Sequence, residues 1–153
     1  KFYVILGLGA LSTLFLLLLG LFFGLQYTAN LNPNAVFGKM DALAYYFVQA
    51  IGYMVLALVF AILIKRSGLA IIAFIAYAQV IEPLIHFRLP DAYDKYMPVK
   101  VLKSLTPMPG QGLLDQMTTP TEQLTQQQAA LFAIGYIGLL LLIAYTILNK
   151  RDL

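Results

Sequence analysis

Few side chains in this sequence offer chemistry, and three of them, Gln79, Glu82 and His86, follow one another at helical spacing. At about 100° per residue they share one face of a helix. An ionisable group inside an apolar segment is costly and is therefore a functional candidate. Two interpretations stay open: the three side chains line a path or a protein interface, or Glu82 and His86 reach lipid headgroups because Pro83 marks the helix end.

Patterns that support catalysis or metal binding are missing from the sequence. Glu82 and His86 have the spacing of a metal pair, but His86 is the only histidine and no cysteine is present. Metalloprotease chemistry needs two histidines with a glutamate, and a phosphate-binding loop needs a glycine-rich run ending in Lys-Ser or Lys-Thr. The three serines, Ser12, Ser67 and Ser104, have no base nearby in sequence. We therefore expect no enzyme, no metal site and no cofactor in this chain.

Two further features concern packing between helices. Gln49 lies in an apolar segment, where an interhelical hydrogen bond contributes about 0.6–2 kcal/mol, so we interpret it as a packing contact more than a ligand contact. Gly20 and Gly24 form a small-xxx-small pair that permits close backbone approach. That pair fits either dimerisation or packing within the same chain.

Four long apolar segments must position these residues: Phe2–Leu25, Leu43–Ile64, Leu69–Ile85 and Ala129–Leu148. A bilayer core about 30 Å thick needs roughly 20 apolar residues as a helix, with a range of about 17–25. Three segments reach that length, and the third lies within the range. The sequence therefore predicts four membrane-spanning helices.

Composition supports the same class. Hydrophobic residues make up 61% of the 153 residues and charged residues 11%, with a mean hydropathy of +0.81. A soluble domain carries about a quarter charged residues. We predict an all-α polytopic membrane protein that forms a single transmembrane domain over residues 1–153. The net charge of +3 does not indicate nucleic-acid binding, because the basic residues stand at the edges of the apolar segments and form no single stripe.

Basic residues also predict the orientation. Five are concentrated in three short edges, namely Lys1, the Lys65–Gly68 turn and the Lys150-Arg151 pair. The other five are spread over two long polar segments, so their number is equal but their density is lower. We predict that both termini and the Lys65–Gly68 turn are cytoplasmic. The more dispersed set is Lys39, Arg88, Lys95, Lys100 and Lys103.

The segment His86–Gln128 is long for a loop, and loops of this length are uncommon unless they are functional. Within it, Val99–Leu105 and Gly112–Met117 each have the pattern of a short amphipathic helix. Such helices would lie on the outer membrane surface or enter the membrane as a re-entrant hairpin. Re-entry requires surrounding protein to satisfy the backbone. The alternative is an ordered loop on the surface of the protein.

This layout resembles the C-terminal part of ABC-2-type permeases, the membrane subunits of one class of ABC transporter. The resemblance rests on the tight basic turn before an apolar helix (Lys65–Ile72), the long outer segment with Tyr96–Leu105, and the final helix running into Asn149–Leu153. It covers essentially the whole chain. The four predicted helices would match the last four of a six-span permease. Because the sequence starts at Lys1 and not at Met, we expect it to be a segment of a longer chain.

The resemblance implies a bacterial inner-membrane subunit that forms a translocation path with a second permease half, as a homodimer or heterodimer. Separate ATP-binding cassette subunits would supply ATP hydrolysis, and lipids would surround the helices. The main coupling helix would lie upstream of Lys1. The alternative is a membrane scaffold that assembles partners and transports nothing. A neighbouring ATP-binding subunit would distinguish the two.

Overall fold

The computed structural model describes residues 2–27, 40–64, 66–86, 88, 95–106 and 124–151, except the side chains of residues 25, 27, 86 and 151. All regular elements in this part of the chain are helical, as predicted. The elements are α1 (Phe2–Tyr27), α3 (Met40–Leu63), α4 (Ser67–Ala76), the π-helical η1 (Tyr77–Ile81), α5 (Glu82–His86), α7 (Pro98–Leu105) and α9 (Gln126–Arg151).

Four helices are long and apolar enough to cross a membrane, which confirms the predicted class. They are Phe2–Gly24, Met40–Leu63, Ser67–Ile85 and Gln126–Lys150. The third is the continuous run of α4, η1 and α5, here called the third helix. The third helix begins two residues before the predicted start and ends at the predicted residue, Ile85. Length and hydropathy define such segments well.

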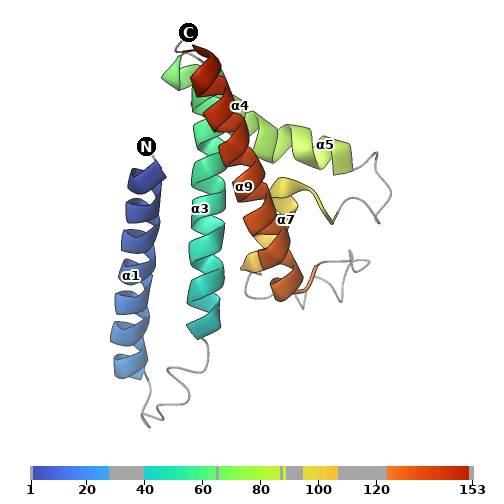
Figure 1. The fold of residues 1–153 in the computed structure, drawn as a ribbon. Coiled ribbons are helices and arrows are strands. Elements are labelled where there is room, and N and C mark those ends of the chain that lie inside the picture. The colour runs from blue at the N-terminus through green and yellow to red at the C-terminus, as the bar shows by residue number, and fades with distance from the viewer. Residues whose placement is uncertain are drawn as a thin grey trace.

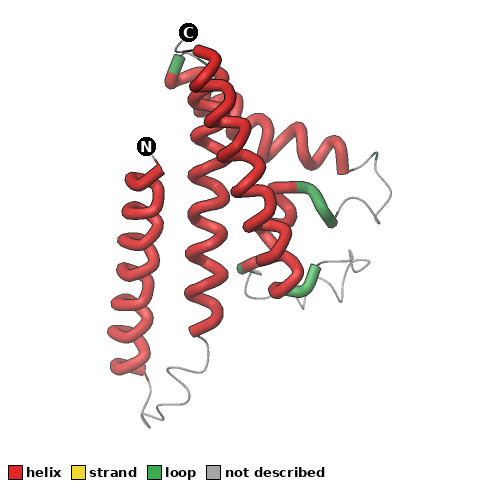
Figure 2. The backbone as a smooth tube through the Cα atoms, viewed as in Figure 1, coloured by secondary structure: helices red, strands yellow, loops and turns green. Residues whose placement is uncertain are grey.

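The long helices α1, α3 and α9 run the length of the molecule (Figures 1 and 2). The beginning of α1, the connection from α3 to α4 and the end of α9 lie toward the same end, here called the turn end. The beginnings of α3 and α9 lie at the opposite end, here called the loop end. This arrangement fits the predicted common side for the termini and the short turn. That this side is cytoplasmic stays a prediction.

The core of the bundle lies between α3 and α9. Toward the turn end, Val59 and Ile62 of α3 pack with Ala144 of α9. Toward the loop end, Ala129 and Ala133 of α9 are fully buried. Small residues allow helices in membranes to approach closely, where dispersion replaces the hydrophobic driving force. The two long helices therefore form the platform on which the other elements pack.

Helix α1 packs on the other side of α3 through a contact that the sequence analysis missed. A Cβ at Gly9 would lie 3.3 Å from Ile51 Cγ1 and 3.5 Å from Phe47 Cε2. A Cβ at Gly20 or Gly24 would meet nothing within 4 Å. The close approach of α1 to α3 at Gly9 lies nearer the turn end, and packing of the Gly20/Gly24 pair within the chain stays a prediction. Dimerisation through the pair stays untested.

The third helix leaves the bundle at a steep angle after the turn (Figure 1). Near its middle, Phe74 and Tyr77 hold it to Phe60 of α3, with ring centroids 6.1 and 5.5 Å from that of Phe60. The π segment comes directly before Glu82 and Pro83, and the backbone N–H of Glu82 donates to the carbonyl of Tyr77, five residues back. Proline has no N–H to donate and clashes with the carbonyl four residues earlier. The wider π turn accommodates Pro83 without ending the helix.

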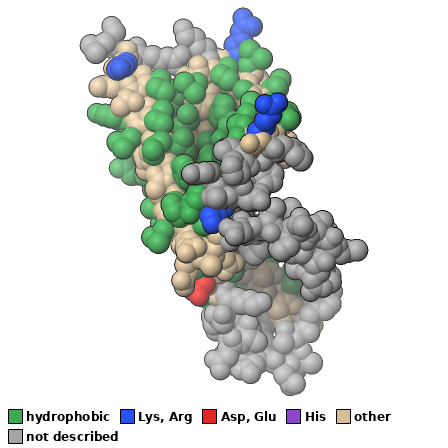
Figure 3. Space-filling model, turned by 90° about the vertical axis from the view of Figure 1, so that its right-hand side faces the viewer, with side chains coloured by type: hydrophobic (Ala, Val, Ile, Leu, Met, Phe, Trp, Pro, Cys, Tyr) green, Lys and Arg blue, Asp and Glu red, His purple; other side chains and the backbone are tan. Residues whose placement is uncertain are grey.

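Large hydrophobic side chains cover the outside of the bundle. Leu11 of α1 is 67% exposed, Ile71 of α4 61% and Leu131 of α9 73%. Figure 3 shows one such face, with hydrophobic side chains over its upper part and Lys or Arg side chains at its top and margins. Helices that are apolar on every side belong in lipid or against other membrane helices. These faces are therefore surfaces for lipid or for partner helices.

Candidate functional site

The candidate site is built around α7, the short helix between the third helix and α9. Pro98 occupies its first turn, where the missing N–H costs nothing and the fixed φ favours a helix. Val99, Val101, Leu102 and Leu105 are buried, whereas Lys103 is exposed. This confirms the short helix predicted over Val99–Leu105. The second predicted helix, Gly112–Met117, lies outside the described residues.

The N-terminus of α7 is capped by Glu82, a residue 16 positions before Pro98 in the chain. Glu82 Oε1 accepts a hydrogen bond from the backbone N–H of Lys100 at 2.8 Å, and Oε2 accepts one from Val99 at 3.3 Å. Met97, at the N-cap position, makes no side-chain cap. The first N–H groups of a helix have no partner inside it. Glu82 therefore supplies from the third helix the cap that the local sequence lacks.

Glu82 faces protein in the described part of the chain, and its role at a path or at the headgroups stays a prediction. The residue is only 6% exposed, and the Tyr77 hydroxyl and the Lys103 ammonium also interact with the carboxylate. A carboxylate at a helix N-terminus gains about 0.3–1 kcal/mol from the helix dipole, and up to about 2 kcal/mol when partly buried. The carboxylate is therefore tolerated in this apolar setting because α7 pairs with it.

The C-terminal end of α7 is held by Gln49 of α3. Thr106, which follows the last helical residue, donates its hydroxyl to Gln49 Oε1. Within α7, the Ser104 hydroxyl donates to the Lys100 carbonyl at 2.9 Å. The interpretation of Gln49 as a packing contact agrees with this hydrogen bond. Gln49 and Glu82 thus fix opposite ends of one helix from two different elements.

Helix α9 contributes a third polar contact, just before α7 begins. The Tyr136 hydroxyl donates to the Tyr96 carbonyl at 2.6 Å. The ring of Tyr96 lies edge-on to Phe132, with centroids 5.1 Å apart. Both contacts orient the chain as it enters α7. Tyr136 belongs to an apolar helix, where a hydroxyl needs a partner, and the backbone carbonyl provides one.

The closest approach in the site is that of α7 to α3 at Gly52. A Cβ there would lie 3.2 Å from Leu102 Cδ1 and 3.4 Å from Leu102 Cγ, and closer still to Cδ2. Leu102 is itself 4% exposed and packs with Ala129 and Ala133 of α9. It has little room to move away, so this contact requires glycine in α3.

These contacts show where α7 lies along the long axis of the bundle. Gly52 is twelve residues after Met40 in the 24-residue α3, which is about 18 Å along the helix. The contacts of α7 with α9 fall at Ala129 and Ala133, in the first third of that helix. Helix α7 thus lies beside the loop-end half of both long helices. Its capped backbone and buried face are compatible with re-entrant structure, and the choice between re-entry and a surface helix stays a prediction.

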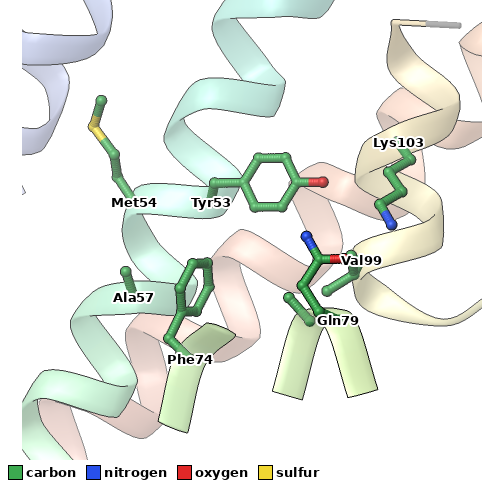
Figure 4. A pocket seen from close by; sticks show the side chains of 8 residues that line it. Tyr53, Met54, Ala57, Phe74, Gln79, Val99 and Lys103 are labelled. Carbon is green, nitrogen blue, oxygen red and sulfur yellow. The ribbon is translucent and has the colours of Figure 1, made fainter. Parts of the chain in front are cut away.

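A groove opens between α3, the third helix and α7. Its volume is about 370 Å³. The Tyr53 hydroxyl, the Gln79 amide and the Lys103 ammonium point toward one another across it (Figure 4). The rest of the lining is apolar, consisting of Met54, Ala57, Phe74, Ala78 and Val99.

The predicted site residues have different surroundings in the structure. Glu82 and Gln49 hold α7, and Gln79 is exposed in the groove. Gln79 and Glu82 both lie next to Lys103 of α7, and a π turn separates them along the helix. The His86 side chain lies outside what the structure describes. That these residues line a path stays a prediction.

Sequence reasoning missed Gly52, Tyr136, Tyr53 and Lys103. A glycine in the middle of an apolar helix is a signal of close approach, but nothing in the sequence names Leu102 as its neighbour. No protein-family model matches the chain, and no curated protein or solved structure matches it either.

Proposed function

We propose that this chain is a transmembrane permease subunit of an ABC-2-type transporter. It would form a translocation path with a second permease half, and separate ATP-binding subunits would power it. The sequence resemblance supports this proposal through the basic turn, the long segment and the final helix. The described fold is consistent with it, because a polytopic helical protein carries a short helix between its third and fourth candidate spans.

The observation that carries the proposal is the position of α7. The resemblance implies short re-entrant helices in the segment before the last span, and α7 occupies this segment, beside the middle of α3. Non-helical chain and helix ends occur at membrane depth only where protein or a cavity surrounds them. Transporters place substrate sites near the midplane at such discontinuous elements. A groove with three polar groups lies between α7 and the middle of α3.

The exposed apolar faces of the long helices leave room for the second permease half. Transporter halves meet through membrane helices, and close-packed interfaces in membranes need little beyond shape and small residues. The ATP-binding subunits would contact the turn end, if that end is cytoplasmic. No described residue is assigned to that contact, because the resemblance places the main coupling helix upstream of Lys1.

Purification of the full-length protein from its native membrane in a mild detergent tests the proposal. We expect a subunit with Walker motifs to co-purify in a fixed ratio, and the reconstituted complex to hydrolyse ATP. A Lys→Ala change in the Walker motif of that subunit is the control that identifies the source of hydrolysis. Stable co-purification of membrane proteins without any nucleotide-binding subunit would instead support the scaffold alternative and contradict the proposal.

A further inference from the structure

We propose that the groove between α3, the third helix and α7 binds one anionic phospholipid from the surrounding bilayer. The acyl region would contact the apolar wall, and the phosphate would accept hydrogen bonds from the donors of Tyr53, Gln79 and Lys103. This inference concerns a lipid site and not the transported cargo. Its test needs no ATP-binding subunit, so it can succeed or fail separately from the proposed function.

The lining has an apolar part and a polar part, as the binding of an amphiphile requires. Five apolar residues form most of the wall, and three hydrogen-bond donors converge on one space (Figure 4). The volume of about 370 Å³ is within the roughly 300–1,000 Å³ of small-ligand pockets. A tyrosine hydroxyl and a glutamine amide can both donate, and a lysine ammonium can only donate. The polar part of the groove is therefore suited to an oxyanion.

Lys103 is the charged residue in the described lining of the groove. Lys103 is exposed there, and its ammonium interacts with Glu82. Glu82 is not the anion that fills the groove, because both of its oxygens accept backbone N–H groups of α7. A phosphate with several oxygens could accept a hydrogen bond from each of the three side chains. Charge-assisted hydrogen bonds are stronger than neutral ones.

The position of the groove makes the bilayer the source of the ligand. Gln79 of the third helix lies level with Tyr53 in the middle of α3, and that helix ends at His86. The exposed Arg88 follows almost at once. The exposed apolar residues Ile75 and Val80 belong to the same helix as Gln79, so lipid chains can lie beside the groove, and the long stem of Lys103 lets its ammonium extend toward a headgroup.

Native mass spectrometry of the full-length protein tests the site. The probes are dioleoyl phosphatidylglycerol and dioleoyl phosphatidylcholine, which share acyl chains and differ in net charge. We expect the first to bind about tenfold more tightly than the second, and Lys103→Ala to remove that preference. Lys103→Arg should retain it, because it keeps the cation. Lys150→Ala removes an equal charge at the exposed end of α9 and should leave the preference unchanged.

Two further arms identify the ligand and guard against misfolding. Ala57→Phe leaves Lys103 intact but fills part of the apolar wall, so it should weaken both lipids. Inorganic phosphate at millimolar concentration should not displace phosphatidylglycerol, because it lacks acyl chains. Equal affinity of the wild type for the two lipids, full displacement by phosphate, or equal effects of Lys103→Ala and Lys150→Ala would overturn the proposal.

Discussion

Glu82 brings a carboxylate into the interior of an apolar bundle, where an ion without partners would be very costly. Its two oxygens accept two backbone N–H groups that α7 cannot satisfy itself. The carboxylate and the two N–H groups therefore offset each other's desolvation cost. The sequence showed that Glu82 was unusual, since an ionisable residue stood inside an apolar segment. Its partners could not be predicted, because they are backbone atoms of another element and leave no side-chain signature.

Removal of the carboxylate should destabilise the protein. Glu82→Ala removes the carboxylate acceptor of two backbone N–H groups, and the loss of a partner costs about 1–3 kcal/mol for a buried group. We expect a loss of at least about 2 kcal/mol, or a Tm lower by about 4–8 °C for a protein of this size. Glu82→Gln keeps one acceptor oxygen, so its effect should be about half. Asp41→Asn, which changes an exposed acid in the first turn of α3, should change the Tm far less in the same detergent.

The hydrogen bond at the other end of α7 should contribute less. Thr106→Val removes the donor to Gln49 at constant shape, and such a neutral bond is worth about 0.5–1.5 kcal/mol. Gln49→Leu should cost a similar amount, and the double variant should cost little more than either single one. Thermal unfolding of the four proteins measures this coupling. Strictly additive losses would show that the two side chains do not act as a pair.

At the scale of elements, the long helices could be predicted from length and hydropathy, and so could the amphipathic α7. The angle of the third helix could not, because it depends on packing against Phe60 and on the π turn before Pro83. Nothing in the sequence distinguishes the contact glycines Gly9 and Gly52 from Gly20 and Gly24. Helix spacing shows which residues share a face, but not which partner that face meets.

The contact between α7 and α3 makes a sharp prediction for Gly52. Gly52→Ala would force Leu102 from its buried position, and overpacking of this kind costs about 1–3 kcal/mol. In a Leu102→Ala background the same change should be nearly neutral, because the clash is gone. Gly135→Ala is the matched control, since a Cβ there meets nothing within 4 Å. Equal Tm values for Gly52→Ala and Gly135→Ala would contradict the close approach.

At the scale of the whole molecule, the described helices bring the beginning of α1, the α3–α4 turn and the end of α9 to one end of the bundle (Figure 1). The sequence predicted this through the number of apolar segments and the density of basic residues. The membrane side of that end depends on insertion and is not a property of packing. For this reason the fold and the orientation need separate tests.

Cysteine labelling tests the orientation directly, since these 153 residues contain no Cys. Ser67→Cys lies at the turn end and Thr125→Cys at the loop end, and both positions are exposed. With an impermeant thiol reagent on intact cells we expect label at 125 and none at 67. Permeabilised cells, in which both should react, are the control. Labelling of 67 alone would reverse the predicted orientation.

The central claim is that α7 is a folded helix inside the bundle whose first turn depends on Glu82. Hydrogen exchange of the amides of residues 99–105, followed by mass spectrometry, measures this most directly. We predict slow exchange in the wild type, and much faster exchange of this segment in Glu82→Ala while peptides from α3 and α9 remain protected. Exchange of these amides within seconds in the wild type, or identical protection in Glu82→Ala, would contradict the account.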